Sequence, residues 1–130
     1  MCGQNMMEEK ILFIDDDTDI RETIKNLITH MGYKVTVAEN AHDALSILDS
    51  EEFPLIITDL KMPGINGTQL CKEIRKVNQS SIIYALSGHL TTFNLDDLSA
   101  IGFDGHLCKP ISFNSFNQAI RGAFDKIKRA

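Results

Sequence analysis

The sequence has little cysteine and no long apolar run, and both shortages exclude classes of protein. Its three cysteines (Cys2, Cys71 and Cys108) are odd in number and far apart, which argues against a disulfide framework and against a CxxC zinc or redox site. Such usage is typical of a reducing, cytoplasmic setting, and Cys71 and Cys108 are expected to be buried. No apolar stretch approaches the roughly 20 residues that span a bilayer, so we expect no membrane contact.

Positive charge is also scarce. The 13 Lys and Arg residues are outnumbered by 18 Asp and Glu residues, which gives a net charge of −5. Nucleic-acid binding depends on basic patches, so we expect none by this domain directly. Residues 121–129 do carry four basic side chains, but these fall in the last turns of a predicted helix, where cations complement the helix dipole.

The sequence does contain a five-fold alternation of short apolar strands and amphipathic helices. Ile11–Ile14 is apolar throughout, as expected of a strand that is covered on both faces. Gly32 is predicted to end the first helix, and Asn40 to cap the second. We predict strands at residues 11–14, 33–38, 55–58, 81–86 and 103–108, and helices at 20–31, 41–48, 70–77, about 93–100 and 113–127.

Apolar residues at helical spacing mark the third helix and the closing helix. The third helix is marked by Leu70, Ile74 and Val77 at helical spacing. The closing helix carries a longer apolar stripe, which we interpret as a core-facing surface: Phe113, Phe116, Ile120, Phe124 and Ile127.

Strands that alternate with helices of this length imply parallel strands joined by right-handed crossovers. We therefore predict a single α/β domain with a doubly wound, flavodoxin-like sheet of five parallel strands and five helices. The domain is expected to span residues 10–128. Residues 1–9 lack the basic-then-apolar layout of a signal peptide and are expected to be an N-terminal extension, disordered or introduced by cloning.

Polar side chains follow four of the five predicted strands. Asp15 and Asp16 follow the first strand, Asp59 the third, Ser87 the fourth and Lys109 the fifth. In doubly wound sheets, functional groups gather at the carboxyl ends of the strands. These five side chains are therefore expected to converge on one edge of the sheet.

This combination of side chains favours phosphoryl chemistry. Three clustered carboxylates would repel one another unless a cation lay between them, and Mg²⁺ suits a site with few direct carboxylate ligands. The Lys109 ammonium and the Ser87 hydroxyl are both suited to holding phosphoryl oxygens. A carboxylate in such a site can act as a nucleophile that forms an aspartyl phosphate.

The acidic run Asp15–Asp17 has other possible interpretations. Asp15–Asp17 would also make a solvated turn that caps the first helix, and we assign Asp17 and Asp19 to that role. A calcium loop is excluded because Ile20 and Asn26 stand where glycine and glutamate are required. A phosphatase-type DxDxT motif is excluded because Asp19 stands at the threonine position.

Four segments together resemble the receiver domain of two-component response regulators, over residues 10–127. They are ILFIDDDTDIRETIKNLI, LIITDLKMPGINGTQL with its D-x-x-M-P-G-x-x-G loop, SIIYALSG and GFDGHLCKPI. The resemblance implies the strand order 2-1-3-4-5. It also implies a cis peptide bond between Lys109 and Pro110.

The resemblance assigns roles to individual residues. Asp59 would be the phosphoacceptor, and Mg²⁺ would be the cofactor. Asp16 and Asp59 would bind Mg²⁺ directly, Asp15 mainly through water, and Lys61 through its backbone carbonyl. The phosphoryl group would be bound by Ser87 and Lys109.

The resemblance also implies partners and a switch. The phosphodonor would be a sensor histidine kinase or a histidine phosphotransfer protein. On phosphorylation Ser87 would move inward, and an aromatic residue of the fifth strand would follow. This would remodel the face of the fourth helix, fifth strand and fifth helix, which would bind a downstream protein or a missing effector domain.

Three residues are expected to adjust this behaviour. His106 stands at the aromatic position, and we hypothesise that it couples to Ser87. Lys61 and His89 are predicted to tune the lifetime of the aspartyl phosphate.

The sequence argues against three alternative functions, of which a degenerate receiver is the runner-up. A degenerate receiver would act only as an interaction or dimerisation module, but the intact set of site residues argues against it. A magnesium-dependent phosphatase would need a further acid–base residue and an insertion that covers the substrate. A flavodoxin-like cofactor binder would need a phosphate-binding first loop, and this one is acidic. We favour a signalling module that assists its own phosphorylation and dephosphorylation, and not an enzyme proper.

Overall fold

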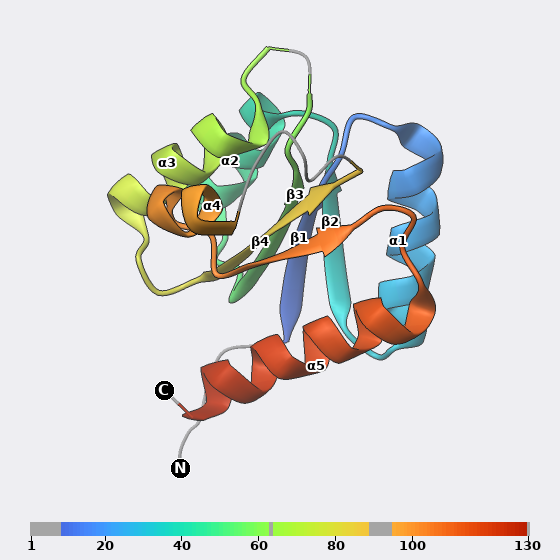
Figure 1. The fold of residues 1–130 in the computed structure, drawn as a ribbon. Coiled ribbons are helices and arrows are strands. Elements are labelled where there is room, and N and C mark those ends of the chain that lie inside the picture. The colour runs from blue at the N-terminus through green and yellow to red at the C-terminus, as the bar shows by residue number, and fades with distance from the viewer. Residues whose placement is uncertain (1–8, 63, 89–94, 130) are drawn as a thin grey trace.

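Five parallel strands form the centre of the protein (Figure 1). A computed structural model describes residues 9–62, 64–88 and 95–129. The sheet order is β2-β1-β3-β4-β5, and the strands are β1 (Lys10–Ile14), β2 (Lys34–Ala38), β3 (Leu55–Asp59), β4 (Ile82–Ser87) and β5 (Gly105–Cys108). The predicted doubly wound sheet and its strand order are confirmed.

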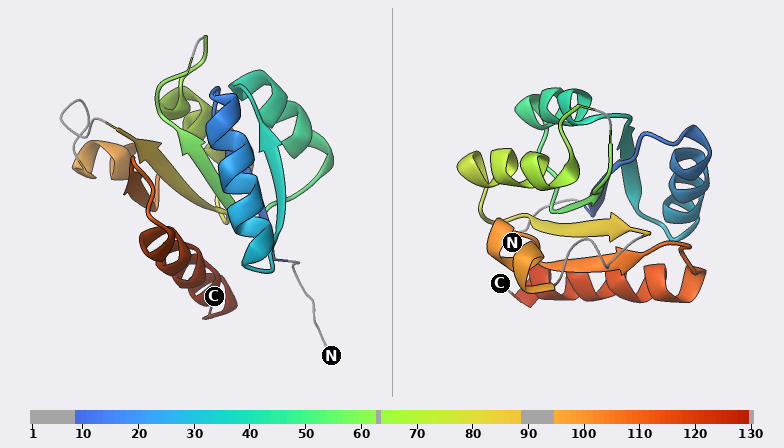
Figure 2. Two further views of the ribbon diagram at one scale, coloured as in Figure 1. Left: turned by 90° about the vertical axis from the view of Figure 1, so that its right-hand side faces the viewer. Right: turned by 45° about the horizontal axis from the view of Figure 1, so that its top comes forward.

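Five helices cover the two faces of this sheet (Figure 2). They are α1 (Thr18–His30), α2 (Ala41–Ser50), α3 (Gly67–Val77), α4 (Leu95–Ile101) and α5 (Phe113–Arg129). Buried side chains of α2, α3 and α4 pack on one face, and those of α1 and α5 on the other. Because both faces are covered, β1, β3 and β4 are buried along most or all of their length.

Side chains cap the first three helices. Asp17 Oδ1 accepts hydrogen bonds from the backbone N–H groups of Asp19 and Ile20, at 2.9 and 3.3 Å. Asn40 caps α2 and Asn66 caps α3 in the same way, through single bonds of 2.8 and 3.0 Å. The predicted capping role of Asp17 is confirmed, so Asp15 and Asp16 are left for another role.

Strand register brings the predicted polar ends to one edge. Thr58 of β3 lies opposite Ile14 of β1, and Asp59 lies opposite Leu86 of β4. Asp15, which follows Ile14, and Ser87, which follows Leu86, therefore lie beside Asp59.

Two expectations about burial, those for Phe113 and Cys108, were wrong. Val77 is 88% exposed and Phe113 is 53% exposed, although both belong to apolar stripes at helical spacing. They are the last residue of α3 and the first residue of α5, so both lie at helix ends, outside the buried residues of these helices. Cys108 is exposed because it ends the edge strand β5, whereas Cys71 is buried as expected.

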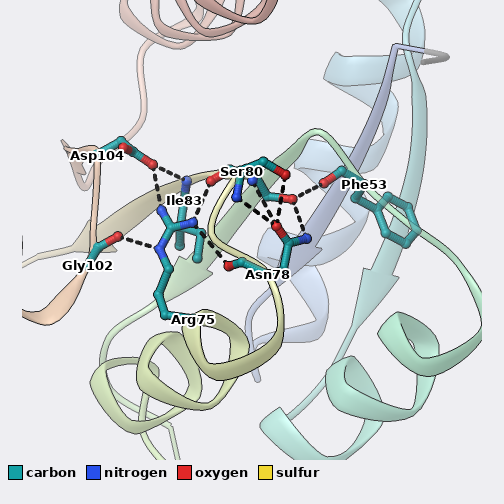
Figure 3. Close-up of polar contacts among 8 residues, drawn as sticks. Phe53, Arg75, Asn78, Ser80, Ile83, Gly102 and Asp104 are labelled. Carbon is teal, nitrogen blue, oxygen red and sulfur yellow. Dashed lines mark hydrogen bonds and ion pairs between the residues drawn. The ribbon is translucent and has the colours of Figure 1, made fainter. Parts of the chain in front are cut away.

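A polar network fixes the opposite edge of the sheet (Figure 3). The Arg75 guanidinium donates to the carbonyl oxygens of Gly102 and Ser81, at 2.9 and 2.7 Å. It also pairs with Asp104 at 2.8 Å. The same Asp104 oxygen accepts the Ile83 N–H at 2.8 Å. Arg75 thus joins the end of α3 to the end of α4 and to the beginnings of β4 and β5.

Candidate functional site

Three carboxylates meet at the carboxyl edge of the sheet. Asp15 and Asp16 follow β1, and Asp59 is the last residue of β3. One oxygen from each lies within 4.8 Å of the other two. The sequence predicted this cluster, and the structure brings all three members together.

Asp15 is held in a defined orientation. Its side chain is fully buried, and its backbone N–H donates to the Ala38 carbonyl of β2 at 3.1 Å. Its Oδ1 accepts the Asp17 N–H at 3.0 Å. Its Oδ2 accepts no hydrogen bond from any residue that the structure describes. A buried carboxylate oxygen without a hydrogen bond is costly, and a bound cation would satisfy it.

Lys109 brings positive charge to the cluster. Its ammonium nitrogen lies 3.3 Å from Asp15 Oδ2 and 3.4 Å from Asp59 Oδ2. Lys109 follows the last residue of β5, and its N–H donates to the carbonyl of Ser87, the last residue of β4, at 3.0 Å. The peptide bond between Lys109 and Pro110 is cis, as predicted.

The cluster changes the pKa values of its members. Burial is the largest cause that raises the pKa of Asp59 to about 6, and the neighbouring Asp15 carboxylate adds to it. Lys109 and the Lys61 backbone N–H act in the opposite direction. Burial alone would lower the pKa of Lys109, but Asp15 and Asp59 together outweigh it and raise that pKa. Asp59 therefore lies in a site with too little positive charge for its carboxylates.

The main chain around Asp59 is tightly fixed. The Thr58 hydroxyl donates to the Asp59 carbonyl at 3.0 Å, and the Leu60 N–H donates to the Leu86 carbonyl at 3.1 Å. The Gly67 N–H, at the start of α3, donates to the Leu60 carbonyl at 3.0 Å. Asp59 is 5% exposed, so only a small opening connects it to solvent.

The remaining predicted residues surround this centre. Lys61 is exposed, and its N–H lies 3.4 Å from Asp59 Oδ1. Ser87 is buried at the end of β4. His106 lies in β5 opposite Ala85, so it shares a sheet face with Ala85 and Ser87. His89 lies outside the described residues.

The donor set fits a hard divalent cation. It offers carboxylate oxygens from three side chains, one of them a buried oxygen with no hydrogen bond. Oxygen ligands of this kind suit Mg²⁺, which binds one or two carboxylates and keeps several waters. The acidic cluster therefore matches the magnesium site expected of a receiver domain.

Sequence reasoning missed one contact in this region. The Arg21 guanidinium, on the second turn of α1, donates to the Asp15 carbonyl at 2.7 Å and to the Thr18 hydroxyl at 3.2 Å. An arginine in a polar helical stretch gives no sign in the sequence that it contacts the main chain of Asp15, six residues earlier.

A doubly wound sheet with clustered aspartates and a lysine at its carboxyl edge defines a class of phosphoryl-binding signalling domain. Residues 11–121 match the family described as response regulator receiver domain. The chain belongs to this family, and it is a signalling module of two-component systems.

Curated relatives support this assignment. The chain is 32% identical over 125 residues to a probable transcriptional regulator, ycf27, of Porphyridium aerugineum, a match that covers 96% of this chain and 52% of the relative. It is 30% identical over 124 residues to the transcriptional regulatory protein AfsQ1 of Streptomyces coelicolor, which covers 92% and 52%. The chain thus spans about half the length of these relatives. It is 26% identical over 116 residues to sporulation initiation phosphotransferase F of Bacillus subtilis, which covers 89% and 94%.

Solved structures agree with the fold. A CheY-like receiver domain protein of Methanospirillum hungatei superposes with a TM-score of 0.89 at 26% identity, covering 95% of this chain and 98% of the other. Response regulator protein TrrA of Thermotoga maritima, in complex with Mg(2+)-BeF, gives 0.80 at 32% identity, covering 90% and 99%.

Among the residues that the structure describes, no helix is long and apolar enough to cross a bilayer.

Proposed function

We propose that Asp59 accepts a phosphoryl group from a phosphohistidine and that its phosphorylation sets the state of the domain. The observation that carries this proposal is the meeting of Asp59 with Asp15, Asp16 and Lys109 at the carboxyl edge of the sheet. A structural role alone does not explain three carboxylates at one point with a single lysine beside them, because such a cluster destabilises the folded chain.

The proposed step is a direct phosphoryl transfer. A carboxylate oxygen of Asp59 attacks phosphorus, an O–P bond forms, and the N–P bond of the phosphohistidine breaks. The electron pair of that bond leaves with the donor imidazole. Lys109 lies 3.4 Å from the Asp59 carboxylate, where its ammonium neutralises charge on the transferred oxygens.

The proposed ligands of Mg²⁺ are the carboxylates of Asp16 and Asp59, the backbone carbonyl of Lys61, and Asp15 mainly through water. Bound there, Mg²⁺ would neutralise the cluster and the charge that develops during transfer. The Mg(2+)-BeF complex of the TrrA relative supports this assignment. We also propose that these groups let the domain assist its own phosphorylation and dephosphorylation.

The proposed donor is a sensor histidine kinase or a histidine phosphotransfer protein. An apolar hollow of about 510 Å³ adjoins the site and supports docking of such a protein, because Lys109 belongs to its wall. The other residues that line it come from α1 and from the segment after β5: Asp19, Ile20, Thr23, Ile24, Leu27, Pro110 and Ile111.

The free thiols of Cys71 and Cys108 agree with a cytoplasmic location, which we also propose.

The proposed output surface consists of α4, β5 and α5. Ser87 and His106 share the sheet face that α4 covers, an arrangement that supports their coupling. We propose that Ser87 binds the phosphoryl group and that His106 responds to it. We further propose that Lys61 and His89 tune the phosphate lifetime, and that residues 10–128 form the receiver domain.

Intact mass measurement tests the assignment of Asp59. The protein is incubated with Mg²⁺ and acetyl phosphate beside Asp59→Asn and Asp49→Asn, the latter an exposed aspartate of α2. We expect one added phosphoryl mass on the parent and on Asp49→Asn, and none on Asp59→Asn. No gain on the parent would favour the degenerate receiver, and equal gain on all three would place the phosphate elsewhere.

A further inference from the structure

The peptide bond between Asp15 and Asp16 is fixed by the side chain of Arg21. The Arg21 Nη1 atom donates to the Asp15 carbonyl at 2.7 Å, a short hydrogen bond with a charged donor. The Nη2 atom of the same guanidinium donates to the Thr18 hydroxyl at 3.2 Å. Arg21 is half-buried, and its two bonds use both ends of the guanidinium fork.

This contact acts on two metal ligands at once. The Asp15 carbonyl belongs to the peptide plane that links Asp15 to Asp16, and a peptide plane moves as a rigid unit. Holding that carbonyl therefore restricts the positions of the Asp15 and Asp16 Cα atoms, from which both side chains extend. The Asp15 N–H is bonded to Ala38, and Asp15 Oδ1 to the Asp17 N–H. The other carboxylate oxygen, Oδ2, accepts no hydrogen bond from the described residues and lies 3.3 Å from the Lys109 ammonium, so it is the oxygen that faces the cation site.

We propose that Arg21 is a positioning residue for the magnesium ligands, an inference that rests on the proposed magnesium site. Arg21 does not touch the ion. It orients the Asp15–Asp16 peptide so that both carboxylates reach the cation without rearrangement. Groups that orient metal ligands typically change metal affinity by about 10- to 100-fold when they are removed.

Arg21 as a simple charge and Arg21 as a positioning residue predict opposite changes in Mg²⁺ affinity when the residue is replaced. Arg21 is a cation close to a cation site, so as a charge alone it repels Mg²⁺, and its removal would strengthen binding. As a positioning residue it has the reverse effect, and its removal weakens binding. The sign of the change in Mg²⁺ affinity therefore separates the two roles.

The experiment is a calorimetric titration of the unphosphorylated protein with MgCl₂. We expect Arg21→Met to raise the Mg²⁺ dissociation constant about tenfold. Arg21→Lys keeps the charge but offers a single ammonium in place of the fork, so its affinity is expected to lie between those of Arg21→Met and the parent. Lys25→Met is the matched control, because Lys25 is an exposed cation one turn further along α1, and we expect less than about a twofold change.

The outcomes are distinct. An unchanged or tighter Mg²⁺ affinity in Arg21→Met, or parental affinity in Arg21→Lys, would overturn the positioning role while leaving the magnesium site intact. Absence of Mg²⁺ binding by the parent would overturn the magnesium site and this inference with it. Thermal unfolding in EDTA accompanies each titration. If Arg21→Met does not fold, the Arg21→Lys titration decides the question.

Discussion

Gly67, the first residue of α3, lies directly against the main chain of Asp59. A methyl group at position 67 would overlap the Asp59 carbonyl oxygen and lie 2.9 Å from the Leu60 Cα atom. Both obstacles are backbone atoms of the proposed acceptor segment, so they cannot move aside without moving Asp59. The glycine at this position is therefore required by the close approach of α3 to the end of β3.

Gly67→Ala is expected to impair the site and the fold together. The added methyl group should displace the end of β3, lower stability by about 2–3 kcal/mol and slow phosphorylation of Asp59. Gly122→Ala is the control, because the added methyl group meets no described atom within 4 Å beyond its own helix backbone, and Ala favours the helix interior by about 0.5–1 kcal/mol. Urea unfolding and intact mass measure both effects. A Gly67→Ala protein as stable and as reactive as the parent would refute the steric requirement.

The raised pKa of Asp59 makes stability depend on pH. In the unfolded chain Asp59 has its ordinary pKa of 3.8, whereas in the metal-free fold its pKa is about 6. The group therefore contributes stability below pH 3.8 that is lost as the pH rises through 6. In EDTA at pH 7.5, Asp59→Asn should be more stable than the parent by about 1–2 kcal/mol.

The difference between parent and Asp59→Asn should shrink towards pH 4 and on addition of Mg²⁺, which would stabilise the ionised carboxylate. Urea unfolding across this range provides the measurement. A constant difference at every pH would show that Asp59 ionises as readily in the folded chain as in the unfolded chain.

Lys109 is expected to support the reactive ionisation state of Asp59. Because Lys109 lowers the Asp59 pKa against the effect of burial, Lys109→Met should raise that pKa above about 6. It should also slow phosphorylation about 100-fold, since a cation beside the transferred oxygens is lost. Carboxyl ¹³C titration and intact mass follow the two effects. Lys128→Met, which removes an exposed lysine that pairs with Glu9, serves as control.

Arg75 is expected to contribute more to stability than its neighbour on the helix. Arg75→Met would leave the Gly102 and Ser81 carbonyls without their guanidinium donor and break the pair with Asp104. We expect a loss of about 2–3 kcal/mol in urea unfolding. Lys76→Met removes an exposed pair with Glu73 and should cost less than about 0.5 kcal/mol. Equal losses would contradict the structural role of the network.

His106 is expected to transmit phosphorylation without taking part in it. His106→Ala should accept a phosphoryl group as the parent does but bind its partner more weakly. In ¹⁵N spectra, the phosphorylation-dependent shifts of β5 should be smaller than in the parent or in the control His42→Ala, an exposed histidine of α2. Parental shifts, together with parental affinity for the partner, would remove His106 from the switch.

The site could be predicted from the sequence because a parallel sheet brings the residues after each strand to one edge. The prediction of the site needed only the apolar strand pattern and the identity of the residue after each strand, which gave Asp15, Asp59, Ser87 and Lys109. Asp17 was separated from the metal site by its capping role, which the structure confirms.

Contacts between side chains and main-chain carbonyl oxygens left no pattern in the sequence. Arg21 and Arg75 are polar residues of amphipathic helices, and their bonds to carbonyl oxygens depend on how the helices pack. The exposure of Val77 and Phe113 was missed for a related reason, because apolar periodicity does not show where the covered part of a helix ends.

The position of β3 in the sheet has a consequence for hydrogen exchange. β3 is the middle strand, every residue in it is buried, and its amides should exchange only when the whole domain unfolds. β5 is an edge strand of four partly exposed residues, and its amides should exchange through small local openings. The proposed acceptor thus ends a strand that is expected to be strongly protected, and His106 belongs to an edge strand that is expected to open locally. We therefore expect the end of β3 to keep its geometry while β5 rearranges.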